Sequence, residues 1–100
     1  MVSTFPGGGA VRSVRSVIFL VEYYEPDSHP SATARIAERA RAAVGELVRQ
    51  GADLRFLRAT LVPAEETCFL LYEAPSAELV AQATQRAAIR GARLTEARES

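Results

Sequence analysis

The sequence predicts an α+β domain in which strands and helices follow one another in the order β-α-β-β-α-β. The length of 100 residues suits a single domain. Along the chain, the apolar residues switch between the spacing of strands and the spacing of helices, and these switches set the order of the elements. Two strand-like segments are separated only by residues 63–66, and such a short connection predicts a hairpin.

The first half of the chain predicts a strand and then a helix. Residues 17–24 begin with a continuous β-branched and aromatic run, which is typical of a central strand buried on both faces. Residues 25–30 carry turn and N-cap chemistry. Apolar residues then recur at spacings of three and four from Ile36 to Val48. We therefore expect an amphipathic helix that ends near Gln50, with Gly51 as its left-handed C-cap.

The second half predicts a hairpin, a second helix and a last strand. Residues 54–62 and 67–74 are the two strands of the hairpin. Ser76 is the expected N-cap of the second helix, and Gly91 is expected to end that helix. Residues 92–97 alternate weakly and predict a final strand at an edge of the sheet.

This order is the split β-α-β plan of the ferredoxin-like fold, a four-stranded antiparallel sheet with two helices on one face. The strands carry large apolar side chains on both sides, whereas two helices cover only one side. We therefore expect a homodimer packed sheet to sheet, a dimeric α/β barrel with room for a cavity between its sheets. The domain is expected over residues 17–97, between a flexible N-terminal arm over 1–16 and a polar tail over 98–100.

Composition narrows the classes of function. Twelve acidic side chains balance twelve basic ones, so we expect no nucleic-acid partner and no membrane partner. No signal peptide or membrane-spanning run is present, and we expect a cytoplasmic protein. The basic residues are all Arg and Ala is abundant, which is typical of a GC-rich, actinobacterial genome. With one Cys and one His, we expect no internal disulfide, no metal site and no other cofactor.

Two candidate functional side chains lie at the end of the first strand. Glu22 follows five apolar residues, and Tyr24 comes two positions later. A carboxylate that leaves a buried strand is suited to general acid or base chemistry, and a Tyr hydroxyl is suited to orienting a substrate. The alternative is that the strand simply emerges into solvent at this point.

Two further candidates lie on the predicted hairpin. If Val62 pairs with Thr67, then Arg58 lies opposite Leu71, and Glu73 is a diagonal neighbour of Arg58 on the same face. The planar fork of Arg58 is suited to a carboxylate or phosphate group of a ligand. The alternative is a structural ion pair between Arg58 and Glu73.

The lone Cys and the lone His are assigned no role. Cys68 alternates with apolar neighbours and has no nearby His to act as a base, so we expect an inert buried thiol. His29 is expected in a surface loop. A metal ion held there with Asp27 or Glu25 needs further donors from a second subunit.

Several short motifs point to one family. Residues 67–78 are the most distinctive stretch, and within them Tyr72-Glu73-Ala74-Pro75 resembles the end of the third strand in a bacterial family of small proteins of largely unknown function that includes nickel-responsive proteins. Residues 20–22, 54–58 and 94–96 resemble other strands of that family in the same order, so the resemblance spans roughly residues 17–97.

The resemblance implies a ferredoxin-like fold, dimerisation through the sheet and, in one branch, nickel held by His and carboxylate side chains. Because His29 is the single His and precedes the first helix, the nickel ligands are not carried over. The leading hypothesis is therefore a small homodimer that binds a ligand in a cavity between its sheets. One alternative is a cofactor-free isomerase, cyclase or hydrolase of secondary metabolism. A second is a nickel-binding protein. The isomerase, cyclase or hydrolase would use Glu22, Tyr24, Arg58 and Glu73 as its catalytic side chains.

Overall fold

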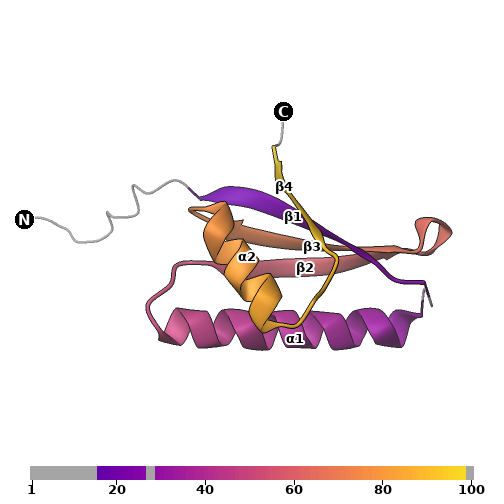
Figure 1. The fold of residues 1–100 in the computed structure, drawn as a ribbon, viewed down its shortest axis with the longest axis horizontal. Coiled ribbons are helices and arrows are strands. Elements are labelled where there is room, and N and C mark those ends of the chain that lie inside the picture. Colours follow the sequence, from indigo (N-terminus) through magenta and orange to yellow (C-terminus); the bar gives the residue numbers. More distant parts are fainter. Residues whose placement is uncertain (1–15, 27–28, 99–100) are drawn as a thin grey trace, which may run out of the picture.

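The computed structural model describes residues 16–26 and 29–98. The predicted arm, apart from Ser16, and the last two residues of the predicted tail lie outside the described residues. The elements follow the predicted order (Figure 1): β1 (Val17–Tyr24), α1 (Pro30–Arg49), β2 (Arg55–Val62), β3 (Thr67–Ala74), α2 (Ala77–Arg86) and β4 (Arg93–Ala97).

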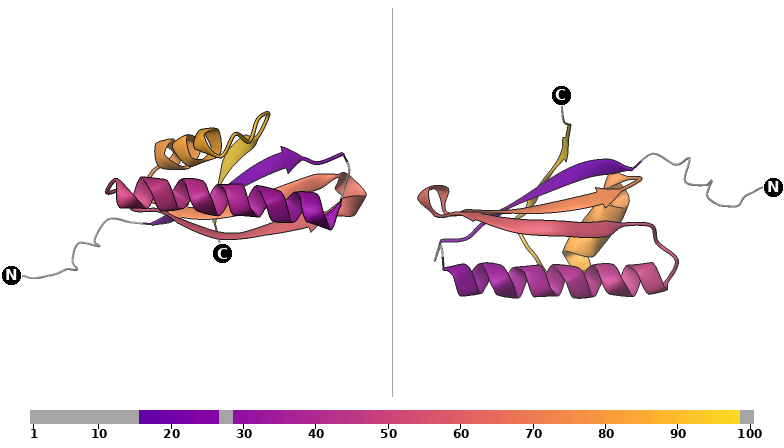
Figure 2. Two further views of the ribbon diagram at one scale, coloured as in Figure 1. Left: turned by 90° about the horizontal axis from the view of Figure 1, so that it is seen from below. Right: turned by 180° about the vertical axis from the view of Figure 1, so that it is seen from behind.

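The strands form one antiparallel sheet in the order β2-β3-β1-β4. As predicted, β2 and β3 are a hairpin, here closed by a single 3₁₀ turn, and the short β4 is an edge strand. Both helices pack on the same side of this sheet (Figures 1 and 2), so the fold is ferredoxin-like. Within the described part of the chain, no helix is long and apolar enough to cross a membrane.

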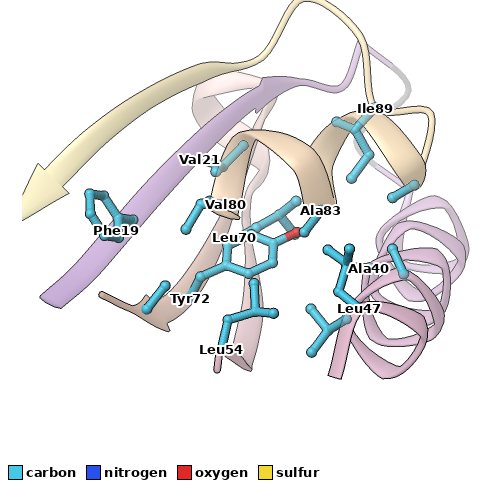
Figure 3. Packing of buried hydrophobic residues seen from close by; sticks show 14 of the residues in the cluster. Phe19, Val21, Ala40, Leu47, Leu54, Leu70, Tyr72, Val80, Ala83 and Ile89 are labelled. Atoms are coloured by element: carbon cyan, nitrogen blue, oxygen red, sulfur yellow. The ribbon is translucent and has the colours of Figure 1, made fainter. Parts of the chain in front are cut away.

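The hydrophobic core lies between the helices and the sheet (Figure 3). Every second residue of β3 from Cys68 to Ala74 is buried, and so are Phe19 and Val21 of β1. This period of two is what a strand covered on one face shows. The apolar stripe of α1 faces these strands, except that Val48, which the pattern assigned to the stripe, is 46% exposed.

The opposite face of the sheet is not covered by any described residue, as the right panel of Figure 2 shows. There the side chains of Ile18 and Leu20 on β1, and of Phe69 and Leu71 on β3, are only partly buried. The prediction that the first strand is buried on both faces is therefore wrong for the described chain. β1 is an inner strand, but the two helices form a single layer on one side of it.

α2 begins at the predicted cap, and α1 begins at the end of the segment 25–30, where His29, expected only in a surface loop, is the cap. His29 caps α1, and its Nδ1 accepts a hydrogen bond from the Ser31 N–H at 3.1 Å. Ser76 caps α2, and its Oγ accepts from the Leu79 N–H at 3.4 Å. The C-cap of α1 is also as predicted, because Gly51 adopts a left-handed φ of 101° directly after Gln50.

α2 ends earlier than predicted, at Arg86 rather than close to Gly91. Ala88 takes a left-handed φ of 61° and reverses the chain, so that Ile89 enters the core at 5% exposure. Arg39 of α1 stabilises this turn by donating hydrogen bonds to two of its backbone carbonyls, at 3.0 and 2.8 Å. Burying an Ile side chain contributes about 1.5–3 kcal/mol, which offsets the strain of about 1–2 kcal/mol at a left-handed Ala.

Candidate functional site

The sheet face opposite the helices, called the open face below, has an apolar centre. The register places side chains in rows that cross all four strands. One row runs from Leu71 of β3 through Leu20 of β1 to Thr95 of β4. Partly buried apolar side chains occupy most of the middle of this face. They are Ile18, Leu20, Leu57, Phe69, Leu71 and Ala97.

Two ion pairs lie at opposite corners of the open face. Arg55 Nη1 is 3.1 Å from Glu73 Oε1 across β2 and β3, at one end of the strands. Arg93 Nε is 3.4 Å from Glu22 Oε1 across β1 and β4, at the other end. Both arginine side chains are largely exposed, so each pair contributes little, about 0–1 kcal/mol.

The hairpin register corrects one predicted contact. Val62 pairs with Thr67 and Arg58 lies opposite Leu71, as predicted, but a β-bulge between Phe56 and Arg58 shifts the pairing. Beyond the bulge, the partner of Glu73 is Arg55 rather than Arg58, and these two side chains form the ion pair described above. The predicted Arg58–Glu73 ion pair is therefore wrong: an extra residue in one strand moves every residue beyond it by one position.

Because of the bulge, Leu57 and Arg58 together border a groove on the open face. The groove has a volume of about 280 Å³ and is lined by Ile18, Leu57, Arg58, Leu71, Ala97 and Arg98. Its floor is apolar, and no acidic side chain lines it. Arg58 is exposed and makes no hydrogen bond or ion pair with any residue that the structure describes. The groove therefore combines apolar surface with an unpaired cation.

Tyr24 is anchored to the hairpin. Its side chain is 61% exposed, and its hydroxyl donates a hydrogen bond to Glu66 Oε1 at 3.0 Å. This hydrogen bond and the negative charge of Glu66 raise the pKa of the Tyr24 phenol. The Glu25 N–H also donates to the Glu66 carbonyl, at 2.6 Å. The Tyr24 hydroxyl therefore ties the end of β1 to the turn that follows β2.

The structure does not bring the four candidate side chains together. Glu22 and Tyr24 lie at one end of the open face, Glu73 lies at the other, and Arg58 lies between them, opposite Leu71. Ile18, the β1 partner of Glu73, precedes Glu22 by four residues, a separation of roughly 13 Å along a strand. Within one chain, a substrate of a few atoms therefore does not reach both the Glu22 and the Glu73 carboxylates.

Two titratable side chains lie in the core on the helix side of β3. Cys68 has no exposed surface, as predicted, and burial raises the pKa of its thiol; of two smaller effects, Thr33 lowers this pKa and Glu25 raises it. Tyr72 is also fully buried, and burial raises its pKa to about 12 against a smaller lowering effect of Thr84. Its hydroxyl has no hydrogen-bond partner among the described residues and points towards α2 beside Ala83 (Figure 3).

No group of three His, Cys, Asp or Glu side chains suited to a metal ion occurs within the described ranges 16–26 and 29–98. His29 is exposed, and its Nδ1 is occupied by the cap of α1. Asp27, which the sequence placed beside a hypothetical metal at His29, lies outside the described residues.

Of the six residues that line the groove, sequence reasoning proposed only Arg58 as a site residue; it missed Ile18, Leu57, Leu71, Ala97 and Arg98. A signal for Leu57 exists, since the adjacent apolar pair Phe56-Leu57 breaks the alternation expected of a strand with one covered face. Arg98 falls in the predicted polar tail, and no pattern in the sequence marks it.

The chain was compared with protein-family models, curated proteins and solved structures. No family model matches the chain, and neither a curated protein nor a solved structure was found to match it, so function is inferred from the geometry of the open face alone.

Proposed function

We propose that this chain is a small homodimeric ligand-binding protein whose two copies pack through their open faces and hold a small molecule between the sheets. The observation that carries the proposal is the apolar centre of the open face, which no described residue covers. Contiguous apolar patches on a protein surface mark sites of association, because water contact with them is unfavourable.

The size of the open face supports a second copy as its cover. A sheet of four strands, three of them eight residues long, is roughly 19 Å wide and 26 Å long, or roughly 500 Å² in projection. Because side chains project from the sheet, its accessible surface is larger than this projected area and approaches the roughly 800 Å² that each partner buries in a stable interface. Two stacked sheets also pack about 10 Å apart, with side chains of both filling the space.

The charges on the open face are compatible with a two-fold contact. Each corner ion pair contains one Arg and one Glu, so a corner of either kind presents both signs to a facing copy. The formal net charge of the chain is zero, so the two copies do not repel each other through their overall charge. The groove, open to solvent in one chain, is then closed by the facing sheet.

The test is the molecular mass in solution and its dependence on the centre of the open face. Sedimentation velocity at micromolar concentration is expected to give a dimer. Leu71→Glu places a charge in the middle of the proposed interface and is expected to give a folded monomer, because an unpaired charge at such a site is costly to bury. Far-UV circular dichroism checks that the variant is folded.

Val48→Glu is the matched control. It also replaces an apolar side chain by a carboxylate, but Val48 lies on α1 and is 46% exposed. This variant is expected to remain a dimer. A wild-type monomer across the micromolar range, or a Leu71→Glu variant that still dimerises, contradicts the proposal.

A further inference from the structure

We infer that the ligand of this groove is a compact apolar carboxylate, held by the Arg58 guanidinium above the apolar floor. The inference rests on the proposed function, since it names the class of ligand for the same site. It starts from the difference between Arg58 and its neighbours. Arg55 and Arg93 have carboxylate partners on the open face, whereas Arg58 has none among the described residues.

The lack of a carboxylate partner for Arg58 becomes important when a second copy covers the open face. When a facing sheet covers the groove, Arg58 loses part of its hydration, and a cation that is removed from water without a partner is destabilising. The groove lining contains no acidic side chain to compensate. Glu73, two positions beyond Leu71 on β3, is already paired with Arg55. A ligand carboxylate supplies the missing charge and fits the two parallel N–H donors of a guanidinium.

The residues that line the groove also determine the polarity and size of the remainder of the ligand. Beside Arg58, the contacts available are Ile18, Leu57, Leu71 and Ala97, so the body of the ligand is apolar. The volume of about 280 Å³ lies just below the range of about 300–1,000 Å³ that is usual for small-molecule sites, so the ligand is compact. Arg98, at the other end of the groove, already pairs with Glu96 at 3.2 Å. One unpaired guanidinium balances a carboxylate but not a phosphate, whose charge is about −2.

Arg58 also borders a second hollow, between β2 and α1, and its chemistry differs from that of the groove. That hollow contains Glu38 as well as Arg41, so its lining already includes a carboxylate. Binding there is distinguished from binding in the groove by which residues the probe contacts, since the groove is lined by Ile18, Leu57 and Leu71 and the hollow is not.

The experiment compares octanoate with 1-octanol, which have similar apolar chains and differ in charge. Isothermal titration calorimetry of the full chain is expected to show octanoate binding at least about tenfold more tightly, the equivalent of about 1.4 kcal/mol. Arg58→Gln is expected to abolish this preference. Arg35→Gln removes the same charge from an exposed position on α1 outside the groove and is expected to preserve the preference. Amide chemical shifts of Ile18, Leu57 and Leu71 locate the bound octanoate.

Sedimentation velocity on the same samples distinguishes failure of the proposed function from failure of this inference alone. A monomer that binds neither probe overturns the proposed function together with this inference. A dimer that binds 1-octanol as tightly as octanoate, or that binds neither probe, overturns only the inference. The same holds if Arg58→Gln and Arg35→Gln behave alike, or if Arg58→Gln weakens the dimer without affecting octanoate, because Arg58 then pairs with the second copy.

Discussion

Replacing Tyr72 by Phe is expected to stabilise the protein, although the substitution removes a polar group from the core. The Tyr72 side chain is fully buried, and its hydroxyl has no hydrogen-bond partner among the described residues. The nearby Thr84 hydroxyl donates to the Val80 carbonyl at 2.8 Å, and its effect on Tyr72 is a smaller lowering of the phenol pKa. A buried hydroxyl without a partner costs about 1–3 kcal/mol. The ring of the variant still packs edge to face on Phe56 at 5.3 Å, so we expect a gain of about 1 kcal/mol at neutral pH, at the low end of that cost.

The pH dependence gives a second, independent signature of the same hydroxyl. Burial raises the pKa of Tyr72 to about 12 in the folded protein, whereas an unfolded Tyr ionises near pH 10. Above pH 10 the unfolded state therefore loses the proton first, and the stability that is present below pH 10 falls as the pH rises towards 12. A difference of about two units corresponds to about 2.7 kcal/mol. The Tyr72→Phe variant lacks this loss, so its advantage over the wild type grows between pH 10 and pH 12.

Urea unfolding followed by far-UV circular dichroism measures both effects, since the chain has no Trp to report by fluorescence. The protein concentration is held constant because association shifts apparent stability. Tyr24→Phe is the control: its hydroxyl is exposed and donates to Glu66, so its removal is expected to give no gain. The reasoning is refuted if Tyr72→Phe destabilises the protein at pH 7, or if its stability falls as steeply as that of the wild type above pH 10.

Three further substitutions or treatments test other parts of the structure. Arg39→Met keeps the aliphatic stem but removes the hydrogen bonds to the Ala87 and Ala88 carbonyls, and urea unfolding is expected to show a loss of about 1–2 kcal/mol; an unchanged midpoint contradicts the role of this contact. Gly51→Ala is expected to cost about 1–2 kcal/mol in the same assay through backbone strain alone, since φ is 101° and no atom lies within 4 Å of an added Cβ. Cys68, buried and with a raised thiol pKa, is expected to react with a disulfide reagent only after unfolding, and a rate close to that of free cysteine in the native state refutes this.

The secondary structure was accessible from the sequence because its signals are local. The run of apolar residues in β1, the spacing of three and four in α1 and the caps at Ser76 and Gly51 depend on neighbours within a few residues. The end of α2 could not be predicted from the sequence. A left-handed Ala88 is unfavourable by itself, and it is tolerated because Ile89 reaches the core and Arg39, almost fifty residues earlier, holds the turn.

The candidate site was accessible only in part. The face shared by Arg58, Leu71 and Glu73 follows from the period of two once the hairpin register is known. The partner of Glu73 did not follow, because the bulge at Leu57 changes the register of every residue beyond it. The separation of Glu22 and Tyr24 from Arg58 likewise depends on where each strand lies along its neighbours.

The sequence by itself determined the α+β order, the antiparallel hairpin and the excess of apolar strand residues over what two helices can cover. These properties depend on periodicity and composition, which are local or additive. Only the tertiary structure decided that Arg55 and Arg93 take the carboxylates of the open face and that Arg58 is left beside an apolar groove. The physical reason is that ion pairs and grooves arise between strands distant in the chain, where a shift of one residue in the pairing changes which side chains meet.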